Sequence, residues 1–392
     1  MKGFRFRFYP NKTQEKLLRQ SLGCARFTYN YFLDLRQKSW HQEGKSINYY
    51  DTSKLLKELK KQPEYSWLKD VSSVVLQQSL IHLQEAYNGF FKKRGGFPHF
   101  KSKRGGGSIT LTRSAFKYED GNIYIAKSKS PLKICWSRQL PSGVYPNSLT
   151  ITLTPSNRWY VSILCETEEQ PLPEVNKSVG IDLGLETFVV TSDGEKIQHP
   201  ILDAEYLKLT KLQRRHAKKQ KGSRNREKAR IKVARQYERI TNIRKDFHHK
   251  LSSRLVSENQ TICLETLNVK GMMKSNLARS IQNVSWSQFV DFLKYKCNDA
   301  GRNFVQIDKW YPSSKTCSNC GCITTNIPKG QKGLKVRYWE CEHCGVEHDR
   351  DINAAKNILV VGTTMIASGD SVRLGEGQQS AKEESEILLV SR

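Results

Sequence analysis

The segment VGIDLG at residues 179–184 places one acid, Asp182, inside an otherwise apolar run. A run of this length and composition predicts a buried strand, where a carboxylate is costly without a partner. The segment ICLE at residues 262–265 repeats the pattern, because an apolar run ends in Glu265. Two predicted strands therefore each carry an acid at or near the end.

A third acidic position lies near the end of the sequence. The segment DRDINAA at residues 349–355 begins a predicted helix with two acids, Asp349 and Asp351. Any one acid alone has a plain structural explanation, as a strand end or as a helix N-cap. Asp351 precedes Ile352, which begins the apolar stripe of the helix. The residues alone leave the choice between the two acids open, with Asp349 as the alternative.

Taken together, the acids indicate a metal site. The predicted order is a strand hairpin, a basic helix, a strand, a helix, a strand and a final helix. A mixed sheet in this order would bring Asp182, Glu265 and Asp351 to one edge. Mg²⁺ or Mn²⁺ prefers carboxylate oxygens, and two such ions about 4 Å apart can hydrolyse a phosphodiester. The pattern favours a two-metal nuclease.

A cysteine pattern separates the second acid from the third. Two C-x₂-C pairs are present, namely Cys317 with Cys320 and Cys341 with Cys344. The 20 residues between the pairs are typical of a structural Zn²⁺ site with four cysteine ligands. A redox pair would not need the second C-x₂-C. His343 and His348 are alternative ligands, and Cys322 is interpreted as a bystander.

The composition restricts the partners. The 392 residues suggest two or three domains, and 65 Lys and Arg against 38 acidic residues give a formal net charge of +27. Such an excess predicts a polyanionic partner. No apolar run approaches the ~20 residues of a membrane-spanning helix, and no signal peptide is visible. We expect a cytoplasmic, nucleoid-associated protein without membrane contact, whose ten cysteines are metal ligands or buried thiols.

The positive charge is concentrated between the first two acids. Residues 208–250 hold about seventeen Lys and Arg against three acids, on one or two long helices predicted at 204–256. A solvated helix face is the usual interpretation of a charge run, but this density favours contacts with phosphates. The candidate nucleic-acid contacts are Arg214, Arg215, Lys218, Lys219, Arg224 and Arg226.

Changes in hydrophobic period predict the domains. Residues 4–9 alternate like a strand, helices are predicted at 12–40, 52–61 and 71–93, and short strands follow a glycine-rich break. We expect a β-barrel from residues 1–10 and 95–172, interrupted by a helical domain at 11–94. A nuclease domain would take residues 175–310 and 347–365, interrupted by a zinc ribbon at 311–346. Residues 366–392 are predicted to be a mobile tail.

These motifs, in this order, resemble the TnpB (OrfB) family of transposon-encoded RNA-guided DNA endonucleases, relatives of type V CRISPR effectors. The resemblance covers about 365 residues. It rests on GIDLG at 180–184, LETL at 264–267, SKTCSNCG at 314–321 and DRDINAAKNI at 349–358. The fold class it implies is multidomain α+β and α/β: a RuvC-like nuclease of RNase H fold with an inserted four-cysteine zinc ribbon, and an N-terminal wedge-like β-barrel with a helical recognition insertion.

The resemblance also implies partners and residue roles. It assigns the third metal ligand to Asp351 and expects a guide RNA from the transposon end that pairs with double-stranded target DNA. Ser73 and Gln77 are candidate readers of a short motif beside the target. A monomer in the RNA complex is expected. The alternatives are an RNA-guided DNA-binding regulator without cleavage and a transposase or recombinase that joins strands itself.

Overall fold

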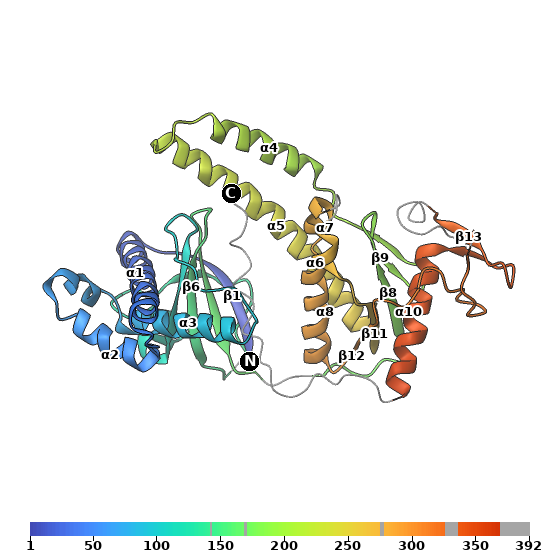
Figure 1. Cartoon of the computed structure of the whole chain (residues 1–392), viewed down its shortest axis with the longest axis horizontal. Helices are drawn as coiled ribbons and strands as arrows, with labels where there is room; N and C mark the ends of the chain where they lie inside the picture. Colours follow the sequence, from blue (N-terminus) through green and yellow to red (C-terminus); the bar gives the residue numbers. More distant parts are fainter. Residues whose placement is uncertain (142, 168–170, 275–277, 326–335, 369–392) are drawn as a thin grey trace. The chain divides into compact units, whose positions relative to one another are not determined.

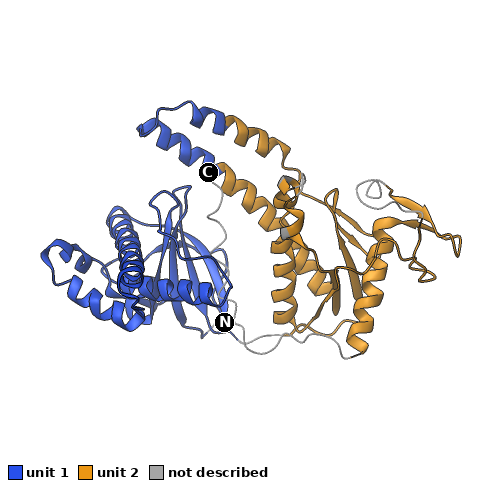
Figure 2. Cartoon of the chain, viewed as in Figure 1, with its two compact units in different colours: residues 1–168, 212–235, 388–392 blue, residues 169–211, 236–387 orange. Residues whose placement is uncertain are grey.

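The computed structural model describes residues 1–141, 143–167, 171–274, 278–325 and 336–368, which form two compact units (Figure 2). Of these residues, unit 1 contains 1–167 and 212–235, and unit 2 contains 171–211 and 236–368. Each unit has its own buried core. Among the described residues, no helix has the length and apolarity needed to cross a membrane.

Unit 1 is built on a five-stranded sheet in the order β2-β6-β7-β1-β5 (Figure 1). β1 (Lys2–Tyr9) pairs antiparallel with β7 (Trp159–Cys165) and with β5 (Lys133–Cys135). β6 (Pro146–Leu153) joins β7 to β2 (Gly107–Thr112). The alternation of buried Phe4, Phe6 and Phe8 along β1 explains why this strand enters the later sheet. The prediction that residues 4–9 join the later strands is confirmed.

The remaining elements of unit 1 are mostly helical. α1 (Lys12–Glu43), α2 (Tyr49–Leu59), the 3₁₀-helix η1 (Pro63–Asp70) and α3 (Ser73–Phe91) lie in sequence between β1 and β2. Asn11 begins α1 through a capping box, since its Oδ1 accepts from Gln14 N at 2.8 Å and Gln14 Oε1 accepts from Asn11 N at 3.1 Å. A short 3₁₀-helix η2 (Arg113–Ala115) precedes the hairpin of β3 (Phe116–Glu119) and β4 (Asn122–Ile125).

Unit 2 contains a mixed sheet in the order β10-β9-β8-β11-β12. β8 (Ser178–Leu183), β11 (Thr261–Glu265) and β12 (Asn303–Ile307) are parallel neighbours. β9 (Thr187–Thr191) runs antiparallel to β8 and is followed by β10 (Lys196–Gln198). Parallel strands need long crossover connections, and helices supply them here. The strands predicted for this half of the chain are confirmed.

Helices cover both faces of this sheet (Figure 1). On one face, α5 (Arg224–Glu258) and α8 (Trp286–Ala300) bury Leu255 and Phe289 with Ile262 and Leu264 of β11. On the other face, Ile358 of α10 (Arg350–Ala367) packs with Cys263. The alternation of side chains along β11 divides the two cores. The remaining elements of this half are α4 (Asp203–Ala217), α6 (Val269–Met272), α7 (Ala278–Val284), β13 (Tyr338–Glu340) and β14 (Glu347–Asp349).

The structure decides one alternative that the sequence left open, and it moves one predicted boundary. The basic stretch forms two helices, because α4 ends at Ala217 and Gly222 takes a positive φ of 83° before α5 begins. α10 continues through Ala367, so residues 366 and 367, which were assigned to the tail, belong to its last turn. The rest of the predicted tail, residues 369–392, lies outside the described residues.

Candidate metal centres and nucleic-acid interface

Asp182 and Glu265 lie at the same edge of the unit 2 sheet. The parallel register pairs Ile181 of β8 with Leu264 of β11. The next residue on each strand is an acid, so Asp182 and Glu265 occupy adjacent positions where two parallel strands end. Both side chains are half-buried. The sheet therefore brings together two of the three predicted acids.

Asp349 and Asp351 have different positions at the start of α10. Asp349 is the N-cap, since its Oδ1 accepts hydrogen bonds from the backbone N–H groups of Asp351 and Ile352, each at 3.1 Å. Its other oxygen is 2.6 Å from Lys196 Nζ. Asp349 therefore has a structural role at the helix end, and Asp351 remains as the candidate ligand.

The charges of the other two acids act on Asp182. Burial, then the charges of Asp351 and Glu265, raise the pKa of Asp182 from 3.8 to about 7, although the Arg350 charge and the Leu183 N–H lower it. Burial raises the pKa of Glu265 to about 6 against a hydrogen bond from Ser313. A carboxyl group whose pKa is raised by neighbouring acids would be stabilised in its charged form by a cation bound beside it.

The acids are near one another but do not form a tight cluster. Among the described residues, the one group of three or more potential ligands whose donor atoms all lie within 4.8 Å is made of cysteines. The oxygen donors fit a hard divalent cation better than a soft one.

Two residues near the acids were not predicted from the sequence. Arg337 Nη1 lies 3.1 Å from Asp351 Oδ2, and Nη2 of the same guanidinium donates to Glu186. Arg337 precedes β13 and is one of many arginines, so nothing in its sequence context singles it out. Ser313, which bonds Glu265, lies in the loop before the first cysteine pair and is equally inconspicuous.

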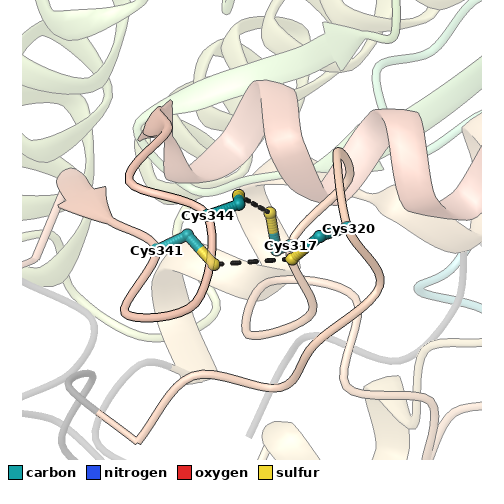
Figure 3. A group of neighbouring side chains, drawn as sticks. All are labelled: Cys317, Cys320, Cys341 and Cys344. Carbon is teal, nitrogen blue, oxygen red and sulfur yellow. Dashed lines mark hydrogen bonds between the residues drawn. The ribbon is translucent and has the colours of Figure 1, made fainter.

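The second centre consists of the four predicted cysteines. Figure 3 shows the side chains of Cys317, Cys320, Cys341 and Cys344 converging from two loops. Cys317 Sγ lies 3.6 Å from Cys344 Sγ, and Cys320 Sγ lies 3.6 Å from Cys341 Sγ. Sulfur atoms at about 2.3 Å from one tetrahedral ion lie ~3.8 Å apart, so the spacing fits such an ion. The predicted grouping of the four cysteines is confirmed.

The neighbouring residues define this centre further. Gly321 and Gly345 follow the two pairs with φ of 78° and 70°, a conformation that side chains rarely adopt. The N–H of Val346, then Asn319, lower the pKa of Cys344 to about 6, which favours a thiolate ligand. His348 Nε2 is 3.0 Å from Cys317 Sγ, so it contacts one of the four cysteines. His343 and His348 lie outside the group of four.

The bystander cysteine has a structural role through its backbone. The carbonyl oxygen of Cys322 accepts from Cys317 N at 2.8 Å, which closes the first turn. Its side chain is not part of the group of four.

The candidate nucleic-acid contacts gather where α4 ends and α5 begins. Arg214, Arg215, Lys218, Lys219 and Arg224 are exposed. Arg226 is half-buried, and its Nη1 donates to the carbonyl oxygen of Lys219 at 2.5 Å and to that of His216 at 3.4 Å. Arg226 therefore also has a structural role, because it closes the turn between the two helices.

Ser73 and Gln77 lie one turn apart at the start of α3, and both are exposed. Residues four positions apart share a helix face, so the two side chains can contact one partner.

Comparisons with known proteins agree with these features. Residues 162–276 match the family model OrfB_IS605, described as "Probable transposase". Residues 286–358 match "Cas12f1-like, TNB domain", and residues 1–45 match a helix-turn-helix domain of the OrfB_IS605 group.

Two relatives match nearly the whole chain. One from Streptomyces pristinaespiralis, named "Putative RNA-guided DNA endonuclease", is 45% identical over 95% of this chain and 92% of its own length. InsQ of Escherichia coli K12, given the same description, is 32% identical over 96% of each chain. The chain is therefore a member of the OrfB (TnpB) family.

A solved structure shows the same overall fold. It is the Cas12f1 chain of a cryo-EM complex with guide RNA and target DNA, with a TM-score of 0.56 and 15% identity over 89% of this chain and 83% of that chain.

Proposed function

We propose that this protein is an RNA-guided DNA endonuclease encoded by a transposon, and that Asp182, Glu265 and Asp351 form its one nuclease site. The observation that carries the proposal is the parallel register of β8 and β11, which places Asp182 and Glu265 at adjacent positions near the ends of two neighbouring strands. The pKa values of Asp182 and Glu265 are both raised. The charge of Asp351 contributes to the raised pKa of Asp182, which supports Asp351 as the third acid of the site.

The site suits two Mg²⁺ or Mn²⁺ ions held by the three carboxylates. Such ions would supply an activated water and would neutralise charge on the scissile phosphate. Asp182 and Glu265 are positioned by rigid strands, and Asp351 by the first turn of α10. The sheet order and the flanking helices support a RuvC-like nuclease of RNase H fold. Arg337, whose Nη1 lies 3.1 Å from Asp351 Oδ2, would compete with a metal ion for this carboxylate.

Zn²⁺ is the proposed ion of the four-cysteine cluster, because four converging thiols at this spacing are its usual structural site. The loops that carry these thiols lie in sequence between β12 and α10, which bears Asp351. The cluster therefore has a structural role beside the nuclease site rather than a catalytic one.

The guide and target contact the protein mainly through phosphates. The exposed arginines and lysines at the turn between α4 and α5 would bind backbones without reading sequence. Guide RNA from the transposon end would pair with one DNA strand. Ser73 and Gln77 on α3 are proposed to contact the motif beside the target, and the sheet of unit 1 to form the wedge-like barrel.

The decisive experiment is cleavage of a DNA duplex matched to the RNA that copurifies with the protein. We expect cutting in Mg²⁺ or Mn²⁺. Glu265→Gln should bind the duplex and leave it intact, whereas Glu258→Gln, at the exposed end of α5, should cut like the parent protein.

Three other outcomes would each contradict a part of the proposal. Cutting by Glu265→Gln would refute the active-site assignment. A matched duplex that is bound but uncut by the parent protein would indicate a regulator. Joined strands without RNA would indicate a transposase or recombinase.

A further inference from the structure

Two asparagines of α10 hold the loop that precedes and enters the first cysteine pair. Asn353 Nδ2 donates to the carbonyl oxygen of Thr316 at 2.7 Å, and Asn357 Nδ2 donates to the same oxygen at 2.6 Å. Asn357 also donates to the carbonyl oxygen of Ser313 at 2.8 Å. In return, Asn353 Oδ1 accepts from the backbone N–H of Ser318 at 2.9 Å.

Both asparagines are buried, with 1% and 4% of their surface exposed. Asn353 and Asn357 lie four positions apart, so their amides point from one face of α10 toward the same loop. A buried amide is costly unless it is hydrogen-bonded, and a leucine would fill this helix face more simply. The amides satisfy backbone groups of a loop that has no regular partner strand at these residues.

This loop contacts both sides of the acidic site. The hydroxyl of Ser313 bonds Glu265 at the end of β11. Asp351 lies two residues before Asn353 on the helix that carries the amides. The next residue of the loop after Thr316 is Cys317, a member of the four-cysteine cluster. Hydrogen bonds therefore connect Glu265 through the loop to Asn353 and Asn357, and the helix backbone connects these two residues to Asp351. The cysteine cluster fixes the other end of the loop.

We propose that Asn353 and Asn357 are positioning residues that set the spacing between Glu265 and Asp351, and so couple divalent-metal binding at the acids to Zn²⁺ retention in the cysteine cluster. This inference rests on the proposed function of the acids. Coupling between two binding sites is reciprocal, so each metal stabilises the binding of the other. Partners that orient metal ligands typically change metal affinity by about 10- to 100-fold.

The test uses Asn357→Asp in the full chain with its RNA. This isosteric change removes the amide donor from the carbonyl oxygens of Ser313 and Thr316 and leaves every proposed ligand in place. Thr364→Ala is the control on α10, because its exposed hydroxyl bonds within the helix, to the carbonyl oxygen of Val360. Asn353→Leu is a second variant that introduces no buried charge.

Three quantities are measured for each variant. They are the rate of zinc release to a chelator, the Mn²⁺ concentration that gives half of the maximal cleavage rate, and the rise in melting temperature caused by Mn²⁺ without DNA. We expect both asparagine variants to release zinc faster and to need roughly tenfold more Mn²⁺, with a smaller fall in the saturated rate. Mn²⁺ should also slow zinc release from the parent protein.

The opposite results separate the two hypotheses. Parent-like zinc release and Mn²⁺ dependence in both variants would overturn the coupling. So would a loss of melting temperature with unchanged Mn²⁺ dependence, because that is the result of a purely structural role. If Glu265→Gln cuts normally, the active-site assignment fails instead, and an effect of the asparagine variants on zinc release would then not depend on the three acids.

Discussion

Gly180 of β8 lies directly against the backbone of α10 at Ala355. A Cβ atom on Gly180 would overlap the carbonyl oxygen of Ala355 and would stand 2.7 Å from the backbone nitrogen of Leu359. The strand that carries Asp182 and the helix that carries Asp351 therefore approach each other more closely than any side chain allows. Glycine is required here for the space and not for a special backbone angle.

Gly180→Ala should consequently destabilise unit 2. Backbone atoms cannot move aside as a side chain can, so we expect a loss of about 3 kcal/mol of unfolding free energy, together with weaker cutting as α10 shifts. Urea unfolding measures the first effect. Gly89→Ala is the matched control, because nothing lies within 4 Å of its added methyl group and Gly89 is inside α3. That change should stabilise the protein by about 0.5–1 kcal/mol, and equal losses in both would contradict the packing argument.

Asp182→Asn should stabilise the protein without divalent metal while it abolishes cutting. The folded-state pKa of Asp182, about 7, lies above its ordinary 3.8, so the folded state holds a proton that the unfolded state releases between these values. Stability from this group therefore falls as pH rises through that window.

We expect the asparagine variant to be more stable by about 1–2 kcal/mol at pH 7.5, after allowance for solvent at this half-buried side chain. The difference should shrink at pH 4. Added Mn²⁺ should raise the melting temperature of the parent protein and not that of the variant. If the parent protein is more stable than Asp182→Asn without metal, burial and the neighbouring acids do not destabilise the charged form of Asp182.

Replacement of Asp349 and of Asp351 by asparagine should have opposite consequences. Asp349 caps α10 and pairs with Lys196, and asparagine caps helices as well as aspartate does, so Asp349→Asn should cost less than about 1 kcal/mol and retain cutting. Asp351→Asn should fold normally and lose cutting by at least about 100-fold, because a proposed metal ligand is lost. Cleavage rates at saturating Mg²⁺ decide between them. Loss of cutting only in the Asp349 variant would reverse the assignment.

Cys341→Ser should remove the metal of the cysteine cluster. The parent protein should contain about one zinc per chain and the variant much less, because three thiolates bind Zn²⁺ more weakly than four. Elemental analysis of the purified protein measures this. Cys135→Ser, at an exposed thiol in unit 1, should leave the zinc content unchanged. A normal zinc content in Cys341→Ser would contradict the ligand set.

Protonation of His248 should weaken unit 2 in acid. Burial, then the Arg244 charge, lower its pKa to about 4, and its ring stacks on Phe188 at 5.1 Å. The unfolded state then binds more protons between about pH 6.5 and pH 4, so stability from this group is lost as pH falls through that range.

The total loss in this range should be about 3 kcal/mol. His248→Phe should flatten the pH dependence of the urea midpoint, and His41→Gln, at an exposed position, should not. An unchanged slope in His248→Phe would assign the acid sensitivity to other groups.

Much of the fold could be predicted because its signals are local. The alternation of Phe4, Phe6 and Phe8 identified a strand. Its three apolar side chains had to be buried, and they pack in the core formed with the later strands. Asp182 and Glu265 each follow an apolar run in the sequence. Two such strands in one sheet were therefore expected to bring both acids to the same edge. The cysteine cluster followed from spacing alone.

The missing parts depend on contacts between distant residues. Arg337 contacts Asp351, and Asn357 contacts Ser313. The partners of each pair are separated in sequence by residues without a periodic hydrophobic pattern, so the sequence did not indicate these contacts. The sequence left open whether the basic stretch forms one helix or two, since Gly222 is one glycine among charged residues, and its positive φ marks the break. The choice of Asp351 over Asp349 needed the family pattern, and the structure supplies a physical reason in the cap at Asp349.

The place of α10 in the chain has a consequence during translation. The ribosome delivers Asp182 and Glu265 long before Asp351, and the face of β11 that Cys263 lines stays open until the helix at Arg350–Ala367 emerges. A product that ends within the cysteine loops would keep the basic turn and α3 and lack the last carboxylate. Without α10, Gly180 and the face of β11 at Cys263 would lose the helix that packs on them, so unit 2 is expected to complete its fold only after this helix has been made.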